Sequence, residues 1–380
     1  MHTESDVIVI GAGFAGLMAA DRLSRMGYSV LIVDHAPKAL AGTSSRNEGW
    51  LHAGTYHALS VRDEAEAIAV ARRCRYGWGE IQRRFPECVE LDPSRSVAVV
   101  PERARASTEH RWRSAGVGFS EMSVQAVQEL RSEVHLSADE VAFEVDDVGI
   151  NTRILASSLT AELVSRGVRF LLGARVRGRQ GDALDVIAPG GVEHVRYRYI
   201  VCAAGYGLGS ACADLDLAPV ELRYWRSHLV SLPRLSGRSV FSTEAGDAAM
   251  INHGAWSIVG LNEDATIVAE PIFEVDDAVA ERLVERVEHR FRNVDRSAIR
   301  KTACIKVDYA PDVGAARSLN VRTIPLASNV LALLPGKMTE SPFSANAVAA
   351  AVFEALGNSS ITDRPIDAYG VQEGKDLAHV

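Results

Sequence analysis

The sequence has little of what marks secreted, metal-binding or nucleic-acid-binding proteins. Its five cysteines are scattered through 380 residues without a Cys-x-x-Cys pair, which argues against a disulfide framework or a zinc site and favours a reducing compartment. The net charge is −8 and no basic run occurs, so we expect no nucleic-acid partner. No apolar run reaches the length of a membrane span, and the first residues leave no room for a signal peptide. We therefore expect a cytoplasmic protein without a transmembrane segment or a bound metal.

The most informative segment is a strand–turn–helix–strand unit over residues 6–34. Val7–Ile10 is a short apolar run typical of a buried parallel strand, a helix is predicted from about Phe14 to Met26, and Ser29–Val33 predicts a second strand. Asp34 follows 34 − 16 = 18 positions after the last glycine of the turn, where a carboxylate accepts hydrogen bonds from ribose hydroxyls. The unit predicts an adenine dinucleotide site, and the acid at 34 disfavours the 2′-phosphate of NADP.

The turn itself reads Gly-Ala-Gly-Phe-Ala-Gly. Gly11 permits a tight turn out of the strand, Gly13 lets a pyrophosphate approach the backbone, and Gly16 lets the helix pack closely on the sheet. Phe14 and Ala15 begin the helix, whose free N–H groups and positive dipole end face the phosphates. A glycine-rich turn without a ligand is the alternative.

A second polar loop, over residues 42–57, distinguishes FAD from NAD. An NAD dehydrogenase has no need of such a loop, whereas the ribityl and isoalloxazine groups of FAD need further hydrogen-bond partners. The loop reads Gly-Thr-Ser-Ser-Arg-Asn-Glu-Gly-Trp-Leu-His-Ala-Gly-Thr-Tyr-His, and it resembles the D-amino-acid-oxidase-like superfamily of FAD oxidoreductases. The likeness is greatest to the branch that holds L-2-hydroxyglutarate and glycerol-3-phosphate dehydrogenases. There the equivalent stretch passes the phosphates and ends beside the flavin ring.

Two further segments carry the resemblance. Residues 199–205, Tyr-Ile-Val-Cys-Ala-Ala-Gly, are similar to the family's returning strand that ends against FAD. Residues 335–339, Pro-Gly-Lys-Met-Thr, precede an alanine-rich helix at Ser344–Leu356 and resemble its flavin-facing turn. With the fingerprint, the resemblance implies FAD contacts from Gly11, Gly13, Phe14, Ala15, Gly16, Asp34, His35, Thr43, Ser44, Ser45, Arg46, Asn47, Val176, Ala203, Ala204, Gly205, Pro335, Gly336, Lys337, Met338 and Thr339.

The order of the predicted elements indicates an α/β chain that alternates between two domains. A Rossmann-like FAD-binding domain with a parallel sheet is expected from residues 1–85, 150–215 and 320–380. An inserted antiparallel-sheet α+β substrate domain is expected from residues 86–149 and 216–319.

Two residues are candidates for catalysis at the flavin. His52 titrates in the right range to take a hydroxyl proton, and the resemblance puts the matching histidine close to the ring. A core histidine bonded to a backbone carbonyl is the alternative. Lys337, one of five lysines, lies in a Pro-Gly turn at a helix start, where a cation would stabilise the reduced, anionic ring. The alternative is a solvated loop lysine.

The predicted strand Val220–Leu232 carries two more candidates. Arg226 and His228 interrupt an otherwise apolar face, because side chains alternate faces along a strand. Buried cationic groups are costly unless paired, so their partner is either a substrate carboxylate or phosphate or an internal Asp or Glu. We interpret Gly246–Met250, which resembles the Gly-Asp-Ala motif of flavin aromatic hydroxylases, as a hairpin loop.

These features favour an FAD-dependent dehydrogenase or oxidase acting on a small polar substrate at a carbon that bears OH or NH. A carboxylate-containing substrate is expected, and a 2-hydroxy acid is preferred to an amine because of His52 and the resemblance around it. A flavin-dependent monooxygenase and a non-catalytic flavin-binding module are the alternatives. The electron acceptor (dioxygen, a quinone or a carrier protein) is not encoded in any motif.

Overall fold

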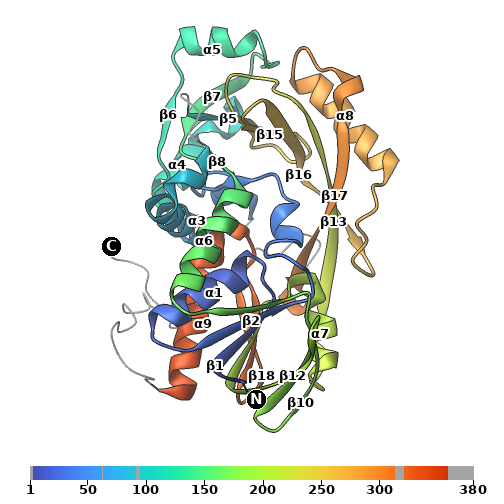
Figure 1. Ribbon diagram of the computed structural model, residues 1–380. Coiled ribbons are helices and arrows are strands. Elements are labelled where there is room, and N and C mark those ends of the chain that lie inside the picture. The colour runs from blue at the N-terminus through green and yellow to red at the C-terminus, as the bar shows by residue number, and fades with distance from the viewer. Residues whose placement is uncertain (1–2, 62, 91–94, 313–320, 358–380) are drawn as a thin grey trace. The chain divides into compact units, whose positions relative to one another are not determined.

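The computed structural model describes residues 3–61, 63–90, 95–312 and 321–357 (Figure 1). The chain divides into two compact units. Unit 1 comprises Met1–Gly42, Ala156–Glu221 and Asn320–Val380, and unit 2 comprises Thr43–Leu155 and Leu222–Leu319. Residues 43–85, expected in the FAD-binding domain, cluster with unit 2. The assignment of either unit to FAD or to substrate stays a prediction.

Unit 1 is built on a parallel sheet. β1 (Thr3–Ile10) pairs in parallel with β12 (Gly191–Cys202) on one side and with β2 (Val30–Asp34) on the other. β9 (Arg169–Leu172) extends the sheet beyond β2, and β19 (Val330–Leu334) runs parallel to β12. Such strands are buried on both faces, which explains why the central ones read as continuous apolar runs. This sheet confirms the predicted Rossmann-like fold.

Hairpins and helices complete unit 1. β11 (Ala183–Ala188) and β10 (Arg175–Gln180) extend β12 as an antiparallel meander, and β18 (Arg322–Ala327) pairs antiparallel with β19. α1 and α9 lie side by side (Figure 1). The helices are α1 (Phe14–Arg25), α6 (Thr152–Ser165), α7 (Leu208–Asp214) and α9 (Ser341–Leu356).

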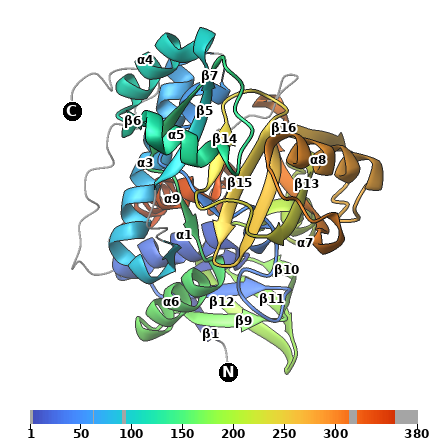
Figure 2. The ribbon, with the colours of Figure 1, turned by 90° about the horizontal axis from the view of Figure 1, so that it is seen from above.

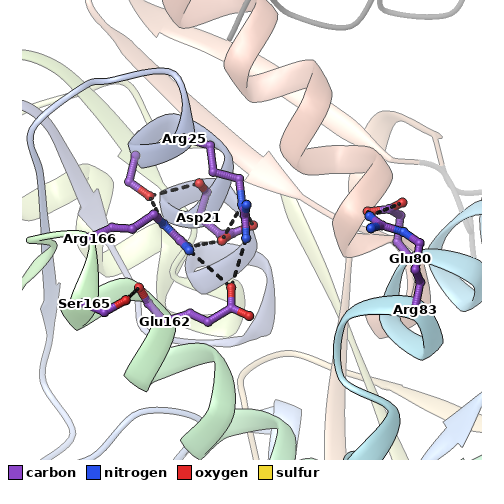
Figure 3. A network of polar contacts seen from close by, with 8 residues as sticks. Asp21, Arg25, Glu80, Arg83, Glu162, Ser165 and Arg166 are labelled. Carbon is purple, nitrogen blue, oxygen red and sulfur yellow. Dashed lines mark hydrogen bonds and ion pairs between the residues drawn. The ribbon is translucent and has the colours of Figure 1, made fainter. Parts of the chain in front are cut away.

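A buried acid ties α1 to the end of α6 (Figure 3). The Asp21 side chain is 3% exposed and forms ion pairs with Arg25, one turn later, and with Arg166. Glu162 on α6 accepts from both arginines, at 3.0 Å from Arg25 Nη2 and 3.2 Å from Arg166 Nη1. Because a buried charge is tolerated only when paired, this network fixes where the two helices meet. The Glu80–Arg83 pair in the same picture is a separate contact within one helix.

Unit 2 is built on an eight-stranded sheet in which each neighbouring pair is antiparallel except β14 (Val240–Ser242) with β5 (Ser96–Pro101). Helix α8 (Asp277–Arg290) lies against β13 (Leu222–Pro233) (Figure 2). Its Leu283, Val284 and Val287 share a core with Val230 and Leu232. This sheet confirms the predicted antiparallel domain. In spatial order the strands are β17 (Arg300–Tyr309), β13 (Leu222–Pro233), β16 (Trp256–Val268), β15 (Ala248–His253), β14 (Val240–Ser242), β5 (Ser96–Pro101), β7 (Glu140–Val145) and β6 (Phe119–Glu121).

A small three-stranded sheet also belongs to unit 2. Its middle strand, β8 (Val148–Ile150), pairs antiparallel with β3 (Trp50–Leu51) and β4 (Val89–Glu90). A long helix, α3 (Glu64–Arg84), ends two residues before Pro86. The other helices of this unit are α2 (His57–Ser60), α4 (Arg105–Ala115) and α5 (Val124–Arg131).

Of the predicted hairpin loop over residues 246–250, Gly246 and Asp247 lie in the turn between β14 and β15, and residues 248–250 begin β15. Gly246 has a φ of +73° and precedes β15, which pairs antiparallel with β14. The neighbouring Asp247 forms an ion pair with Arg290 at the end of α8. Arg290 also binds both oxygens of Glu140, at 3.0 and 2.9 Å. The acid of this segment therefore serves the interior of unit 2.

Candidate functional site

The ends of the parallel strands in unit 1 meet at the glycine turn. Gly11 N donates to Val33 O at 2.8 Å, and Ala203 N donates to Ile10 O at 2.8 Å. The carboxyl ends of β1, β2 and β12 are therefore held against one another. In open α/β sheets, this is the edge at which ligands bind.

The turn leaves no room for side chains at two of its glycines. Gly11 has a φ of +111°, and a Cβ there would lie 2.5 Å from Ala203 O. A Cβ on Gly16 would lie 2.0 Å from Gly11 O. Gly13 is the N-cap of α1 and carries no capping side chain, so Phe14, Ala15 and Gly16 begin the helix beside a bare backbone. This cradle fits the pyrophosphate of a dinucleotide.

Asp34 turns back toward the glycine turn. Its Oδ2 accepts from Ala12 N at 2.6 Å and its Oδ1 from Ala36 N at 2.8 Å. Each carboxylate oxygen has two lone pairs, so these bonds leave acceptor capacity for ribose hydroxyls. His35 Nδ1 lies 3.4 Å from Asp34 Oδ1, and its side chain is 73% exposed. Buried Val176 follows Ala174, whose N–H donates to Asp34 O at 2.9 Å.

A fourth strand end brings the second predicted turn to the same edge. β19 runs parallel to β12 and ends at Leu334, directly before Pro335. Gly336 has a φ of +68°, and Lys337 N donates to Pro335 O at 2.7 Å. Met338 and Thr339 then lead through a 3₁₀ turn into α9. The structure thus collects, in unit 1, the predicted FAD contacts Gly11, Gly13, Phe14, Ala15, Gly16, Asp34, His35, Val176, Ala203, Ala204, Gly205, Pro335, Gly336, Lys337, Met338 and Thr339. Their contacts with FAD stay predictions.

The remaining predicted cofactor residues lie in unit 2. Thr43, Ser44 and Ser45 form one 3₁₀ turn. Asn47 Nδ2 donates to Ser44 O at 3.0 Å, and Asn47 Oδ1 accepts from Gly49 N at 2.8 Å, which closes the loop on itself. The Arg46 guanidinium lies over the Phe273 ring, 4.8 Å from its centroid. The role of this loop toward FAD stays a prediction.

The His52 imidazole lies beside a buried carboxylate. Its Nδ1 lies 3.3 Å from Asp147 Oδ1, and its side chain is 20% exposed. The ring of buried His57 meets it edge to face, with centroids 4.5 Å apart, and the Trp50 ring stacks at 6.1 Å. The catalytic role of His52 stays a prediction.

Arg226 pairs with an internal acid, the second possibility raised by the sequence, whereas His228 accepts a hydrogen bond from the backbone of the same acidic residue. Arg226 Nη2 lies 3.3 Å from Asp276 Oδ2, and Asp276 N donates to His228 Nε2 at 2.9 Å. Nε2 is thus the acceptor nitrogen of the His228 ring. The pKa of the Asp276 carboxyl is lowered, and the hydrogen bond from the Val279 N–H makes the largest contribution. A role for either residue in substrate binding stays a prediction.

Sequence reasoning missed two groups of polar residues in unit 2. Asp147 is fully buried and is bound by the chain segment that follows His52. His253 donates from Nδ1 to Glu90 Oε2 at 2.7 Å and from Nε2 to Glu48 O at 2.7 Å. Burial opposes the charged imidazole, but the hydrogen bonds to Glu90 and Glu48 raise the pKa of His253. No sequence signal marks these pairs, because the strands that bring them together are very short or distant in the chain.

The remaining features concern thiols, metal ligands and the membrane. All five cysteines are buried, and burial raises the pKa of Cys88 to about 12. Among the residues that the structure describes, no group of three or more His, Cys, Asp or Glu side chains is placed to hold a metal ion. Within the same part of the chain, no helix combines the length and the apolarity needed to cross a membrane.

Fold and glycine cradle together define a dinucleotide-binding α/β protein with an antiparallel second unit. The model of the FAD-dependent oxidoreductase (DAO) family matches residues 6–333, and the chain belongs to this family. FAD is therefore its cofactor, and the close backbone approach at Gly11 and Gly16 fits that group.

Individual known proteins agree with this assignment. A probable FAD-dependent oxidoreductase of Pseudomonas aeruginosa, PA4991, is 26% identical over 242 residues, which are 60% of this chain and 58% of that protein. The mitochondrial L-2-hydroxyglutarate dehydrogenase of Arabidopsis thaliana is 50% identical over 52 residues, 14% of this chain and 11% of the relative. The chain thus matches less than two thirds of the length of either relative. The FAD-bound L-α-glycerophosphate oxidase of Mycoplasma pneumoniae shares the fold, with a TM-score of 0.72, 14% identity and coverage of 93% and 94% of the two chains.

Proposed function

We propose that the protein is an FAD-dependent dehydrogenase or oxidase that oxidises a small polar, carboxylate-containing substrate at a carbon bearing OH or NH. The match of the family over residues 6–333 carries the proposal. A 2-hydroxy acid is preferred to an amine. The local 50% identity to an L-2-hydroxyglutarate dehydrogenase, and a histidine already paired with a carboxylate, both support that preference.

The oxidation breaks the C–H bond and the O–H or N–H bond of the substrate and forms a C=O or C=N bond. When bound, FAD supplies the acceptor for the hydride equivalent, and dioxygen, a quinone or a carrier protein later removes the two electrons. His52 takes the proton from the hydroxyl or amine, and its imidazole is suited to do so near neutral pH.

The other candidate residues bind and orient. The backbone of Gly11–Gly16 and the start of α1 would hold the pyrophosphate, and Asp34 the ribose. Lys337, at the turn before α9, would favour negative charge on the reduced ring. Arg226 would reach a substrate carboxylate only by sharing or exchanging its pairing with Asp276.

The test is anaerobic mixing of the purified holoenzyme with matched panels of 2-hydroxy acids and 2-amino acids in a stopped-flow spectrophotometer. We expect at least one 2-hydroxy acid to bleach the flavin absorbance in a saturable, single-turnover reaction. Bleaching by amino acids alone would reverse the order of the two substrate classes. If neither panel bleaches the flavin and substrate-dependent NAD(P)H oxidation appears, the protein is a monooxygenase. A stable yellow protein that is inert in both assays would instead be a binding module.

A further inference from the structure

A buried carboxylate lies directly behind His52. In the antiparallel pair of β3 and β8, Trp50 is opposite Gly149 and Leu51 is opposite Val148. Continuing that register by one residue brings His52 opposite Asp147, where both chains leave their strands. Two side chains at directly opposed positions of an antiparallel pair are close enough to interact, as the 3.3 Å separation of His52 Nδ1 and Asp147 Oδ1 shows.

We propose that Asp147 is a positioning residue for His52. It keeps the proton of the neutral imidazole on Nδ1 and thereby leaves Nε2 as the nitrogen that receives the substrate proton. This inference rests on the proposed function, in which His52 is the base.

Asp147 is itself firmly placed. Its side chain is 0% exposed, so its charge must be matched by hydrogen-bond donors. Ala53 N donates to Oδ1 at 3.2 Å, and the Thr55 hydroxyl donates to Oδ2. The donors come from one short segment that begins at His52, so the carboxylate and the imidazole are held by the same turn of chain. Thr55 is also fully buried, which limits alternative rotamers for this contact.

The direction of the hydrogen bond fixes the tautomer. An ionised carboxylate can only accept, so a bond between Asp147 Oδ1 and His52 Nδ1 requires the proton on Nδ1. The other ring nitrogen, Nε2, then carries the lone pair. When Nε2 takes a proton from the substrate, the ring becomes an imidazolium, and a negative charge behind Nδ1 stabilises that product. His57 and Trp50 border the ring but supply no negative charge.

The first experiment reads the tautomer without any substrate. The holoenzyme is labelled with ¹⁵N-histidine, its ring nitrogens are observed by long-range ¹H–¹⁵N NMR, and His52→Gln assigns the signal. We expect His52 in the Nδ1–H form in the wild type and a shift toward the Nε2–H form in Asp147→Asn. A wild-type His52 in the Nε2–H form would overturn the proposal, whatever the variants do.

The second experiment separates positioning from structure. In anaerobic flavin reduction, we expect Asp147→Asn to lower the limiting rate by about tenfold to a hundredfold, less than the about 10²–10⁴ that a general base supplies. We expect the acid limb of the pH–rate profile of Asp147→Asn to move to lower pH by about one unit, because the imidazolium of His52 loses a nearby negative charge. Substrate dissociation should change by less than about threefold. Asp185→Asn is the matched control, because Asp185 Oδ1 lies 2.6 Å from His194 Nδ1 on the exposed face of unit 1. It should leave rate and pH profile unchanged.

Thr55→Val gives the remaining test. It removes a donor from Asp147 Oδ2 but keeps the carboxylate beside His52, so the Nδ1–H form and the pH profile should persist even if the melting temperature falls. If Thr55→Val loses the Nδ1–H form and the wild-type pH profile as fully as Asp147→Asn does, Asp147 acts only through the local fold. That result would contradict the proposal. If no compound reduces the wild-type flavin, the proposed function fails, while the NMR experiment still decides how Asp147 controls His52.

Discussion

Replacing Asp34 with Asn is the most direct test of the nucleotide site. The Asp34 carboxylate accepts from Ala12 N at 2.6 Å and from Ala36 N at 2.8 Å, one bond to each oxygen. An amide of the same shape has one oxygen and one NH₂ group, so it can accept from only one of these two N–H groups. The other N–H then faces a second donor, and the negative charge that binds ribose hydroxyls is lost.

Two magnitudes follow from this geometry. The side chain is 14% exposed, so an N–H left without an acceptor costs about 1–3 kcal/mol of the free energy of unfolding of the apoprotein. Loss of one charge-assisted hydrogen bond to the ribose costs FAD binding about 1.5–3 kcal/mol, and therefore raises its dissociation constant by about tenfold to a hundredfold.

The assay pairs urea unfolding of the apoprotein with titration of FAD, followed by quenching of its fluorescence. Asp6→Asn is the matched control, because Asp6 Oδ2 accepts from Ser29 N at 2.9 Å and Ser29 Oγ at 2.8 Å, before the start of β2. We expect both variants to lose stability but only Asp34→Asn to lose FAD affinity. Equal FAD affinities in the two variants would refute the assignment of Asp34 to the ribose.

Three further outcomes are expected. Arg290→Leu removes the partner of Glu140 and Asp247, whose side chains are 8% and 15% exposed. It should lower the free energy of unfolding by about 3–5 kcal/mol, because two buried carboxylates lose their counter-charge. A loss of less than about 1 kcal/mol in urea unfolding would contradict the buried network. The raised pKa of His253 adds stability that is complete below its ordinary pKa of about 6.5 and disappears as pH rises through the raised value. Glu90→Gln should therefore weaken the dependence of the melting temperature on pH above neutrality. An unchanged dependence would show that the His253–Glu90 pair does not cause it. Lys337→Met should lower the flavin reduction potential by roughly 30 mV for each 1.4 kcal/mol by which the reduced, anionic flavin is destabilised. The potential is measured by dye-coupled titration, and an unchanged value would show that Lys337 is a solvated loop residue.

The features that the sequence predicts well are local. Gly16 is required because Gly11 O comes within 2.0 Å of where its Cβ atom would lie, and Gly11 itself has a φ of +111°, so both requirements arise within the turn. The alternation that places Arg226 and His228 toward α8 is likewise a property of one strand. Such features were readable because no distant segment has to be known.

Features that depend on distant pairing were not predicted. Asp147 reaches His52 through a strand of two residues, too short for any periodicity to show. Asp276, the partner of Arg226, lies fifty positions away at a helix start. Residues 86–149 were expected in an antiparallel sheet, and three strands from this region join the sheet of unit 2, but β5 does so through a parallel pairing with the distant β14.

The interleaved order of the two units has a consequence for biosynthesis. β1 pairs with β12 across a sequence separation of 199 − 7 = 192 residues, and β12 pairs with β19 across a separation of 330 − 200 = 130 residues. During translation β1 therefore leaves the ribosome long before its partner β12, and residues Thr43–Leu155 of unit 2 are made in between. Non-local contacts of this kind slow folding and leave apolar edges open to misassembly. We expect refolding from denaturant to be slow and the yield in cells to depend on chaperones that shield the nascent chain.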